Sequence, residues 1–349
     1  MRLAFFIDKL SNGGAERVTT VLANYFAVDN EVYLFVADDQ QIDYHISENI
    51  TILKVPFSPS KLRRMLDRRN YVAKKIKEIG FDACISLTYT FLPYILTASK
   101  TNRGTVIASL RNAPQFEMQS IVGRLFRWMG FSLCDRIVFQ TPDARDYFSR
   151  NIRNKGSVIP NPITENLPRA GRSRERTILM ATRLEKQKNI PLAIEAFREF
   201  HKSHKDWTLE IYGRGSLLGE LEQLVQSDKE SRDAIHINGF AKNIHELMAH
   251  CGVFLLSSDF EGLSNSMFEA MAIGAPVVCT NCPIGGARMM IQSGENGILV
   301  PTGDGVAIAN ALAVIADKPE TARAIGQQAM RIREELSVEH ICAKWKSLI

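Results

Sequence analysis

The sequence predicts an α/β protein made of two doubly wound parallel-sheet domains. Short apolar runs rich in β-branched residues alternate with longer amphipathic runs, which is the pattern of parallel strands covered by helices. A chain of 349 residues is also longer than one hydrophobic core usually supports. The alternation stops in a Pro-containing, charged stretch and resumes at Thr177. We therefore predict a first domain over 1–165 and a second over 166–334, facing a cleft, with a C-terminal helix over 335–349 that packs back on the first domain.

Apolar runs of strand length mark the two sheets. The strands predicted in the first domain are Leu3–Ile7, Glu31–Ala37, Ala83–Leu87, Thr105–Leu110 and Asp135–Gln140. Those predicted in the second are Thr177–Ala181, Thr208–Tyr212, Ile235–Ile237, Val253–Leu256, Pro276–Cys279 and Gly297–Val300. Amphipathic runs predict helices at Ala15–Ala27, Arg63–Ile79, Gln119–Phe131 and Val338–Ile349. In doubly wound domains ligands bind at the carboxyl ends of the strands, so the loops that follow the strands are where we expect the chemistry.

The composition is that of a globular protein without a membrane span. Hydrophobic residues make up 45% and charged residues 23% of the chain, and no apolar run approaches the roughly 18 residues that a spanning helix needs. The first apolar run is short and ends at Asp8, so we interpret it as a strand and expect a cytoplasmic protein. The pair Cys279 and Cys282 lacks a second cysteine pair or spaced histidines, so we assign it a structural or incidental role rather than a metal site.

The positive charge lies in the first half of the chain. Residues 1–170 carry 23 Lys/Arg against 16 Asp/Glu, whereas residues 171–349 carry 20 against 22. The excess is concentrated in the run Lys61–Lys77. Such a run is often a solvated helix face; the alternatives are an anionic membrane surface or an anionic acceptor. No nucleic-acid-binding motif accompanies the run, so nucleic acid is not expected.

Two loops have residues suited to phosphate. Gly13 and Gly14 lie between the first predicted strand and a helix, where backbone N–H groups approach a phosphate closely, although glycine here also fits a purely steric turn. Arg183 and Lys188 lie in the loop after the first strand of the second domain, where paired cations suit a diphosphate, although a solvated basic loop is the simpler interpretation. Gly213 follows the next strand and faces the same sheet edge.

The stretch from Ser257 to Thr280 is the most informative. A strand leads into a polar loop with Glu261, a carboxylate that can accept neighbouring hydroxyls of a sugar. A helix is predicted to begin around Ser264–Ser266, with Ser266 and Glu269 as a capping box. The N–H groups of Gly262, Leu263, Ser264 and Asn265 then favour an anionic phosphate. Glu269 is predicted to reach a second hydroxyl pair such as a ribose diol.

Several motifs occur in one order: Gly13-Gly14-Ala-Glu-Arg, Val158-Ile-Pro-Asn-Pro162, Arg183-Leu-Glu-x-x-Lys188, Asn238-Gly-Phe, and Glu261-x7-Glu269 followed by Ala-Met-Ala-x-Gly-x-Pro-Val-Val. With these motifs the chain resembles the family 4 glycosyltransferases of bacterial polysaccharide synthesis. The resemblance covers nearly the whole chain. It implies the GT-B fold, with two Rossmann-like domains, and retaining transfer from a nucleotide sugar without a metal.

The resemblance also implies roles for single residues. The residues matching Arg183 and Lys188 hold the donor diphosphate and stabilise charge on the leaving nucleotide. Glu261 matches a contact to the donor sugar and Glu269 a contact to the ribose. The remaining matches are Gly13 and Gly14 near the diphosphate and Ala241 near the base. Together with Gly213 and the loop of Gly262, Leu263, Ser264 and Asn265, these make up the predicted donor site.

The chain departs from the family pattern at two places. Many relatives carry a histidine near the reacting sugar where this chain has Arg111 and Asn112, so these two are candidate substrate-binding residues without an assigned contact. Ser264 stands where proline is common, and a backbone contact survives that change.

The function predicted in this way is transfer of a hexose or N-acetylhexosamine from a UDP-sugar to a saccharide, lipid-linked in many relatives. No cofactor is expected. The partners are then the nucleotide-sugar donor, the acceptor and an anionic membrane surface that the basic first domain, including Arg124–Trp128, contacts at the inner face of the cell membrane. Two alternatives stay open: a non-catalytic nucleotide-sugar-binding partner of another transferase, and a UDP-sugar epimerase of the same fold.

Overall fold

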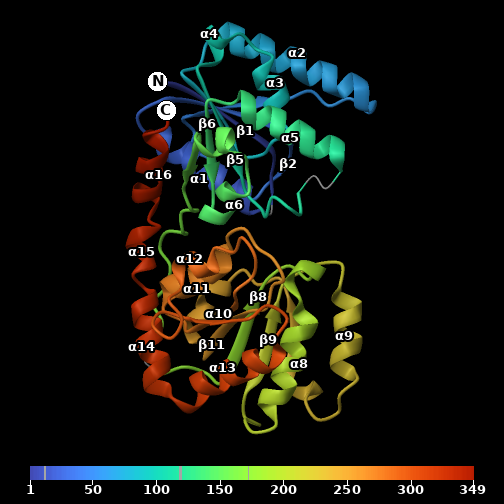
Figure 1. The fold of residues 1–349 in the computed structure, drawn as a ribbon, viewed down its shortest axis with the longest axis vertical. Coiled ribbons are helices and arrows are strands. Elements are labelled where there is room, and N and C mark those ends of the chain that lie inside the picture. Colours follow the sequence, from blue (N-terminus) through green and yellow to red (C-terminus); the bar gives the residue numbers. More distant parts are fainter. Residues whose placement is uncertain (12, 118–119, 172) are drawn as a thin grey trace. The chain divides into compact units, whose positions relative to one another are not determined.

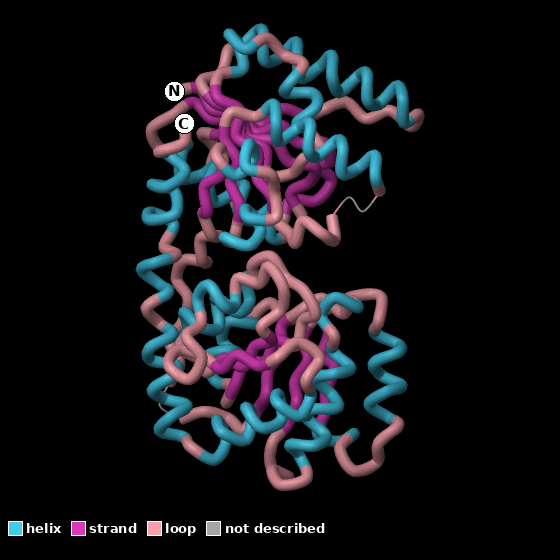
Figure 2. The backbone as a smooth tube through the Cα atoms, in the orientation of Figure 1, coloured by secondary structure: helices cyan, strands magenta, loops and turns pink. Residues whose placement is uncertain are grey.

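The computed structural model describes residues 1–11, 13–117, 120–171 and 173–349. The chain divides into two compact units: unit 1 is Met1–Pro162 with Val338–Ile349, and unit 2 is Ile163–Ser337. Each unit is a parallel β-sheet with helices packed around it, as Figures 1 and 2 show. The predicted α/β class and the doubly wound domains are therefore confirmed.

Unit 1 contains a seven-stranded sheet in the order β3-β2-β1-β4-β5-β6-β7. Its strands are β1 (Arg2–Leu10), β2 (Glu31–Ile42), β3 (Ile50–Lys54), β4 (Ala83–Ser86), β5 (Thr105–Leu110), β6 (Arg136–Phe139) and β7 (Gly156–Val158). Its helices are α1 (Gly14–Phe26), α2 (Lys61–Ile79), α3 (Leu92–Leu96), α4 (Lys100–Arg103), α5 (Ile121–Leu133), α6 (Pro142–Asp146), α7 (Arg150–Arg153) and α16 (Val338–Lys346). The last helix, α16, contacts α1, and the side chain of Trp345 is fully buried.

Unit 2 contains a six-stranded sheet in the order β10-β9-β8-β11-β12-β13. Its strands are β8 (Thr177–Ala181), β9 (Thr208–Tyr212), β10 (Ile235–Gly239), β11 (Val253–Leu256), β12 (Val277–Thr280) and β13 (Ile298–Val300). Its α-helices are α8 (Ile190–His201), α9 (Leu218–Gln226), α10 (Ile244–His250), α11 (Asn265–Ile273), α12 (Ala287–Met290), α13 (Gly305–Asp317), α14 (Pro319–Ala329) and α15 (Ile332–Glu335). Two 3-10 turns, η1 (Lys186–Lys188) and η2 (Arg232–Ala234), complete it.

The predicted strands all occur, with ends that differ by a few residues. Two strands of unit 1 were missed, β3 and β7, which form the two edges of its sheet. Both are partly exposed and lack a continuous apolar run, because an edge strand is covered less than a central one. The predicted helix at Gln119–Phe131 corresponds to α5, and its predicted first residue lies outside the described residues.

The helices α11 and α5 depart from ordinary amphipathic helices in opposite directions. In α11 every side chain from Met267 to Ile273 is buried, so the helix is enclosed on all sides. In α5 the two buried residues are Arg127 and Phe131, whereas most of its apolar side chains face outward. The exposed apolar residues of α5 are Ile121, Val122, Leu125, Phe126, Trp128, Met129 and Leu133. Among the described residues, no helix combines the length and hydropathy that crossing a bilayer requires.

Candidate active site

The strand order of unit 2 reverses between β8 and β11. β8 pairs with β9 on one side and with β11 on the other, so the loops after β8 and β11 leave their strands in neighbouring positions. In doubly wound sheets such a switch point is where ligands bind. The loop after β8 carries Arg183 and Lys188, and the loop after β11 carries Glu261. The fold of unit 2 therefore brings these predicted residues to one place.

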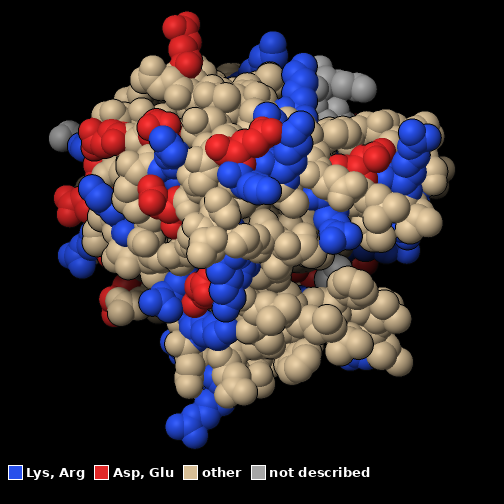
Figure 3. All heavy atoms as spheres, turned by 90° about the horizontal axis from the view of Figure 1, so that it is seen from above, with Lys and Arg blue, Asp and Glu red and all other residues tan. Residues whose placement is uncertain are grey.

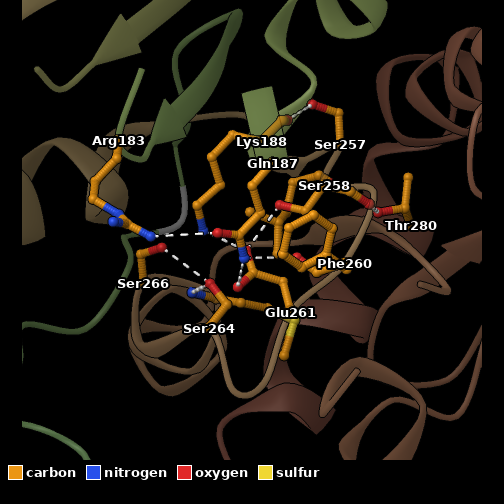
Figure 4. A network of polar contacts seen from close by, with 12 residues as sticks. Arg183, Gln187, Lys188, Ser257, Ser258, Phe260, Glu261, Ser264, Ser266 and Thr280 are labelled. Carbon is orange, nitrogen blue, oxygen red and sulfur yellow. Dashed lines mark hydrogen bonds and ion pairs between the residues drawn. The ribbon is translucent and has the colours of Figure 1, made fainter. Parts of the chain in front are cut away.

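A mostly buried ion pair joins the two loops. Lys188 Nζ donates to Glu261 Oε1, with 11% and 10% of the two side chains exposed. The same carboxylate oxygen accepts from Ser258 Oγ at 2.8 Å, and Gln187 Nε2 donates to the Phe260 carbonyl at 2.8 Å. Figure 4 shows the side chains of Lys188, Gln187 and Ser258 converging on Glu261. Since a carboxylate has about four lone-pair sites and an ammonium three donors, both groups keep capacity for a ligand.

Further hydrogen bonds fix the loops before any ligand binds. Ser257 Oγ donates to the carbonyls of Lys188 and Asn189 at 2.9 and 3.0 Å. Asn189 has left-handed backbone angles (φ 43°) and donates from Nδ2 to Asp259 Oδ1 at 2.7 Å. Left-handed backbone is costly for a residue other than glycine, so these bonds hold a strained turn in place. The ion pair is thus presented by a preorganised frame.

The loops after β9 and β10 continue the same edge. Leu184, next to Arg183, donates from its N–H to the Arg214 carbonyl at 2.9 Å, and Gly213 donates to the Gly239 carbonyl at 2.7 Å. A Cβ at Gly213 would overlap the Thr182 carbonyl oxygen, so only glycine permits this approach of the two loops. Arg183 itself is exposed, with Nη2 3.4 Å from Gln187 Oε1.

Ala241 and Asn265 are two further predicted donor contacts in unit 2. Ala241 lies two residues after the last residue of β10, partly exposed in the turn before α10. Asn265 is partly exposed and is the first residue of α11. Both follow strands of the unit 2 sheet, Ala241 after β10 and Asn265 after β11, and so lie toward its carboxyl edge.

The start of α11 differs from the predicted capping box. Ser264, not Ser266, is the N-cap, and its Oγ accepts from the Met267 N–H at 3.4 Å. Glu269 therefore lies beyond the first turn of the helix, too far to bond the cap. The capping box was a wrong prediction: Ser264 and Ser266 are both suitable N-cap residues, and the helix begins after the first of them.

Glu269 instead joins distant segments of unit 2. Its Oε1 accepts from Thr164 Oγ1 at 3.0 Å, and its Oε2 lies 3.1 Å from Nε2 of His245, which belongs to α10. Glu269 is 6% exposed and lies in the middle of α11, among buried apolar side chains. A polar group this buried is held by its hydrogen bonds, so its position is fixed.

The turn between Glu261 and α11 is held by close packing. The Gly286 N–H donates to the Gly262 carbonyl at 2.8 Å. Leu263 is buried, and a Cβ at Gly286 would overlap its side chain. This packing fixes the backbone from Gly262 to Ser264, whose N–H groups were predicted to face a phosphate.

The predicted residues of unit 1 lie at the carboxyl ends of β1 and β5. Gly13 is the N-cap of α1, and Tyr44 Oη both donates to its carbonyl (2.9 Å) and accepts from its N–H (3.0 Å). Gly14 is the first residue of α1, and their neighbour Asn12 lies outside the described residues. Since Tyr44 engages its N–H, Gly13 offers that group to a phosphate only if this bond opens.

Arg111 and Asn112 follow β5 and have different partners. Arg111 Nη1 donates to Asn161 Oδ1 at 2.6 Å, and its guanidinium lies 5.5 Å from the centre of the Trp345 ring. Burial lowers the pKa of Arg111 to about 9. Asn112 Oδ1 accepts from the Ala113 N–H at 2.9 Å. The Asn112 side chain thus stabilises the local turn, whereas the Arg111 side chain extends into the interior of unit 1 toward Asn161 and Trp345.

Two family models match successive parts of the chain. The model described as Glycosyltransferase Family 4 matches residues 12–167, and the model described as Glycosyl transferases group 1 matches residues 164–331. The chain belongs to the family 4 glycosyltransferases. The match of the second model contains every predicted donor contact of unit 2, from Arg183 to Glu269.

Individual relatives are similar over most of this glycosyltransferase. An uncharacterised glycosyltransferase of Haemophilus influenzae is 23% identical and covers 100% of this chain and 99% of its own. A Campylobacter jejuni enzyme named N-acetylgalactosamine-N,N'-diacetylbacillosaminyl-diphospho-undecaprenol 4-alpha-N-acetylgalactosaminyltransferase is 27% identical over 86% of both chains. The crystal structure of Anabaena HepE in complex with UDP superimposes with a TM-score of 0.83 at 18% identity, over 99% of both chains. The predicted GT-B fold is thereby confirmed.

Several partners of the candidate site in this glycosyltransferase were not predicted from the sequence. Gln187 and Ser258 lie inside segments that were singled out, but side chains of this type gave no reason to prefer them. Thr164 lies in the polar stretch between the domains, and His245 lies in a helix that no motif marked. The one available signal was the position of His245 shortly after Asn238-Gly-Phe.

The cysteines of the glycosyltransferase lie in the interior of its two units. All six are buried, and burial raises the pKa of Cys282 to about 12. Among the described residues, no three His, Cys, Asp or Glu side chains are grouped as metal ligands.

Proposed function

We propose that this enzyme is a retaining, metal-independent hexosyltransferase that moves a hexose or N-acetylhexosamine from a UDP-sugar to a lipid-linked saccharide during synthesis of a cell-surface glycan. The observation that carries the proposal is the Lys188–Glu261 pair at the switch point of unit 2, with Arg183 on the same loop. Two relatives support the substrates: HepE has been crystallised with UDP, and the Campylobacter enzyme is named for a diphospho-undecaprenol acceptor.

The proposed mechanism is electrostatic. Arg183 and Lys188 neutralise the charge that grows on the leaving diphosphate as the bond from the anomeric carbon to its oxygen breaks. The acceptor oxygen forms its bond to the same face of the sugar, and its proton passes to the departing phosphate oxygen. Glu261 accepts hydrogen bonds from hydroxyls of the transferred sugar, and Glu269 accepts them from hydroxyls of the ribose. Because the two cations supply the positive charge, no metal is required in this proposal.

The two glutamates are expected to separate binding of the sugar from binding of the nucleotide. Glu269→Gln should reduce thermal stabilisation by UDP and by the UDP-sugar alike, because both ligands contain the ribose. Glu261→Gln should reduce stabilisation by the UDP-sugar alone. A ligand that binds only the folded state stabilises it by RT ln(1 + [L]/Kd), so thermal-shift titrations measure both effects.

Thermal-shift titration followed by an assay of UDP release distinguishes the proposed transferase from the two alternatives. A transferase releases UDP slowly from its UDP-sugar in water, a binding partner releases none, and an epimerase converts the sugar without releasing UDP as the main product. The wild-type enzyme is therefore screened across nucleotide sugars for stabilisation and then for UDP release. Failure of every nucleotide sugar to be turned over, also with acceptor extracts, would refute the proposal.

We further propose that unit 1 docks on an anionic membrane surface. In α2 most cationic side chains are exposed and only Val72 and Ile76 are buried. Figure 3 shows Lys and Arg side chains distributed over a face that also has wide uncharged areas. Exposed apolar side chains of α5, such as Phe126 and Trp128, suit the interface between water and lipid.

One predicted lipid contact is wrong. Arg127 was expected to face lipid with Arg124 and Trp128, but it is 4% exposed. Its Nη1 donates to the carbonyls of Pro114 and Glu117 at 2.6 and 3.0 Å. These carbonyls need a donor, and the cation satisfies them, so Arg127 supports the fold of unit 1 instead. Arg124 is exposed and stays a candidate.

Binding to liposomes is expected to depend on both salt and the apolar face of α5. Association with vesicles containing anionic lipid should fall steeply between low and physiological ionic strength, because salt screens charges beyond about 8–10 Å. Trp128→Ser should weaken it further at every salt concentration. Vesicle flotation measures both. Equal binding to neutral vesicles, unaffected by salt, would contradict the docking proposal.

A further inference from the structure

Two hollows of unit 1 share a wall. A polar cavity of about 240 Å³ and an apolar groove of about 370 Å³ are both lined by Tyr89 and Thr90, in the segment that follows β4. The cavity is further lined by Asp8, Ala15, Leu87, Thr88, Ser109, Arg111 and Glu117. β1 pairs with β2 and β4, so the strand order reverses between β1 and β4 here, as it does at the donor loops of unit 2.

Three residues that line the polar cavity have buried hydrogen-bonding atoms without partners. Thr88 Oγ1, Arg111 Nε and Nη2, and Glu117 Oε2 are all buried and have no hydrogen-bond partner among the described residues. Burial raises the pKa of the Glu117 carboxyl to about 7, against the opposing charge of Arg127. Buried polar atoms are normally satisfied, so several orphans around one cavity indicate a ligand that completes them. Donors and an acceptor at adjacent positions match neighbouring hydroxyls of a sugar.

The apolar groove lies between α3 and α5. Its walls are the side chains of Leu92, Pro93, Leu96, Phe126, Met129 and Leu133. Gly130 also lines the groove and leaves space in it. A Cβ added at this glycine would meet only the Leu92 side chain, at an ordinary contact distance of 3.6 Å. Three of these lining residues, Phe126, Met129 and Leu133, belong to the exposed apolar face of α5.

We propose that the two hollows together bind one amphiphilic acceptor, with its terminal sugar in the cavity and the start of its lipid chain in the groove. The inference rests on the proposed function and specifies its acceptor. Arg64 and Arg68 of α2 line a further hollow together with Tyr94 of α3, and Arg124 is exposed on α5; such cations complement an anionic phosphate linkage. Because the hollows share Tyr89 and Thr90, few sugars fit between the accepting sugar and the lipid. The enzyme therefore acts early, on a short lipid-linked glycan that a preceding transferase has begun.

The test uses the full chain and a panel of octyl and methyl glycosides of glucose, galactose, N-acetylglucosamine and N-acetylgalactosamine. At concentrations below micelle formation, at least one octyl glycoside should bind wild type about tenfold or more tightly than its methyl counterpart. Gly130→Leu, which fills the groove, should abolish the preference for the octyl glycoside while leaving the affinity for the methyl glycoside unchanged. Gly130→Ala is the matched control and should keep the ratio. Glu117→Gln and Thr88→Val should weaken both glycosides equally.

Several outcomes would overturn the inference. One is a wild-type enzyme with no preference for the octyl chain on any sugar, and another is a Gly130→Leu variant that keeps the preference. A concentration-dependent dimer that Gly130→Leu abolishes would assign the groove to a second copy of the chain. Thermal stabilisation by UDP is followed in every variant. If UDP stabilises the protein but the glycosides do not bind as expected, only the inference about the acceptor is refuted. If no nucleotide sugar binds, the proposed function is refuted.

Discussion

Replacing both members of the Lys188–Glu261 pair is expected to give a folded but inactive enzyme. The pair is mostly buried, so Lys188→Met or Glu261→Gln alone leaves an uncompensated group and should cost about 3–5 kcal/mol of unfolding free energy. The double variant removes both charges and should recover most of that loss. UDP release should nevertheless fall about 100- to 1,000-fold, as for loss of a preorganised charge-stabilising group.

Denaturant unfolding and UDP release separate these two effects. Lys186→Met is the matched control, since Lys186 is an exposed cation on the same loop and should change stability by less than about 0.5 kcal/mol. A double variant that is both stable and active would show that the pair is structural only. A double variant as unstable as the single ones would show that the loss comes from packing rather than from charge.

Gly213→Ala is expected to damage stability and donor binding together. The new Cβ would overlap the Thr182 carbonyl oxygen. This oxygen belongs to the backbone, so no side-chain rotation can relieve the overlap. Thr182 precedes Arg183, so relief of the overlap moves the cationic loop. We expect a loss of about 2 kcal/mol or more in unfolding free energy, with weaker stabilisation by UDP.

The matched control for this substitution is Gly219→Ala. Gly219 lies in α9, and a Cβ there meets nothing within 4 Å. Alanine is the better helix former, so this variant should be neutral or more stable by up to about 1 kcal/mol. Thermal unfolding with and without UDP compares the two variants. A Gly213→Ala variant as stable and as responsive to UDP as Gly219→Ala would contradict the close approach of the loops.

The central strands and the grouping of the predicted donor loops could be predicted from the sequence. Strands such as β8, β9 and β11 are predicted with the observed ends, because a buried parallel strand is a continuous apolar run between turn signals. Arg183, Lys188 and Glu261 could be placed together because parallel strands end at the same sheet edge. The edge strands β3 and β7 show no such run, so they stayed hidden.

Side-chain partners were beyond prediction where they join distant segments. Thr164 and Glu269 are 105 positions apart, and only the packed unit brings them into contact. Arg127 was placed outward because cations usually are, yet the carbonyls of Pro114 and Glu117 hold it inside. The unpartnered atoms of Thr88 and Glu117 are likewise invisible in a sequence, since being unpartnered is a property of the surroundings.

The enclosure of α11 limits what random mutagenesis can reveal about this enzyme. Each position from Met267 to Ile273 is buried, so nearly every substitution there disturbs packing. A survey of tolerated variants would mark the whole helix as intolerant, and Glu269 would look no different from its apolar neighbours. The effect of a single substitution on activity is therefore easier to interpret at the exposed Arg183 than in α11.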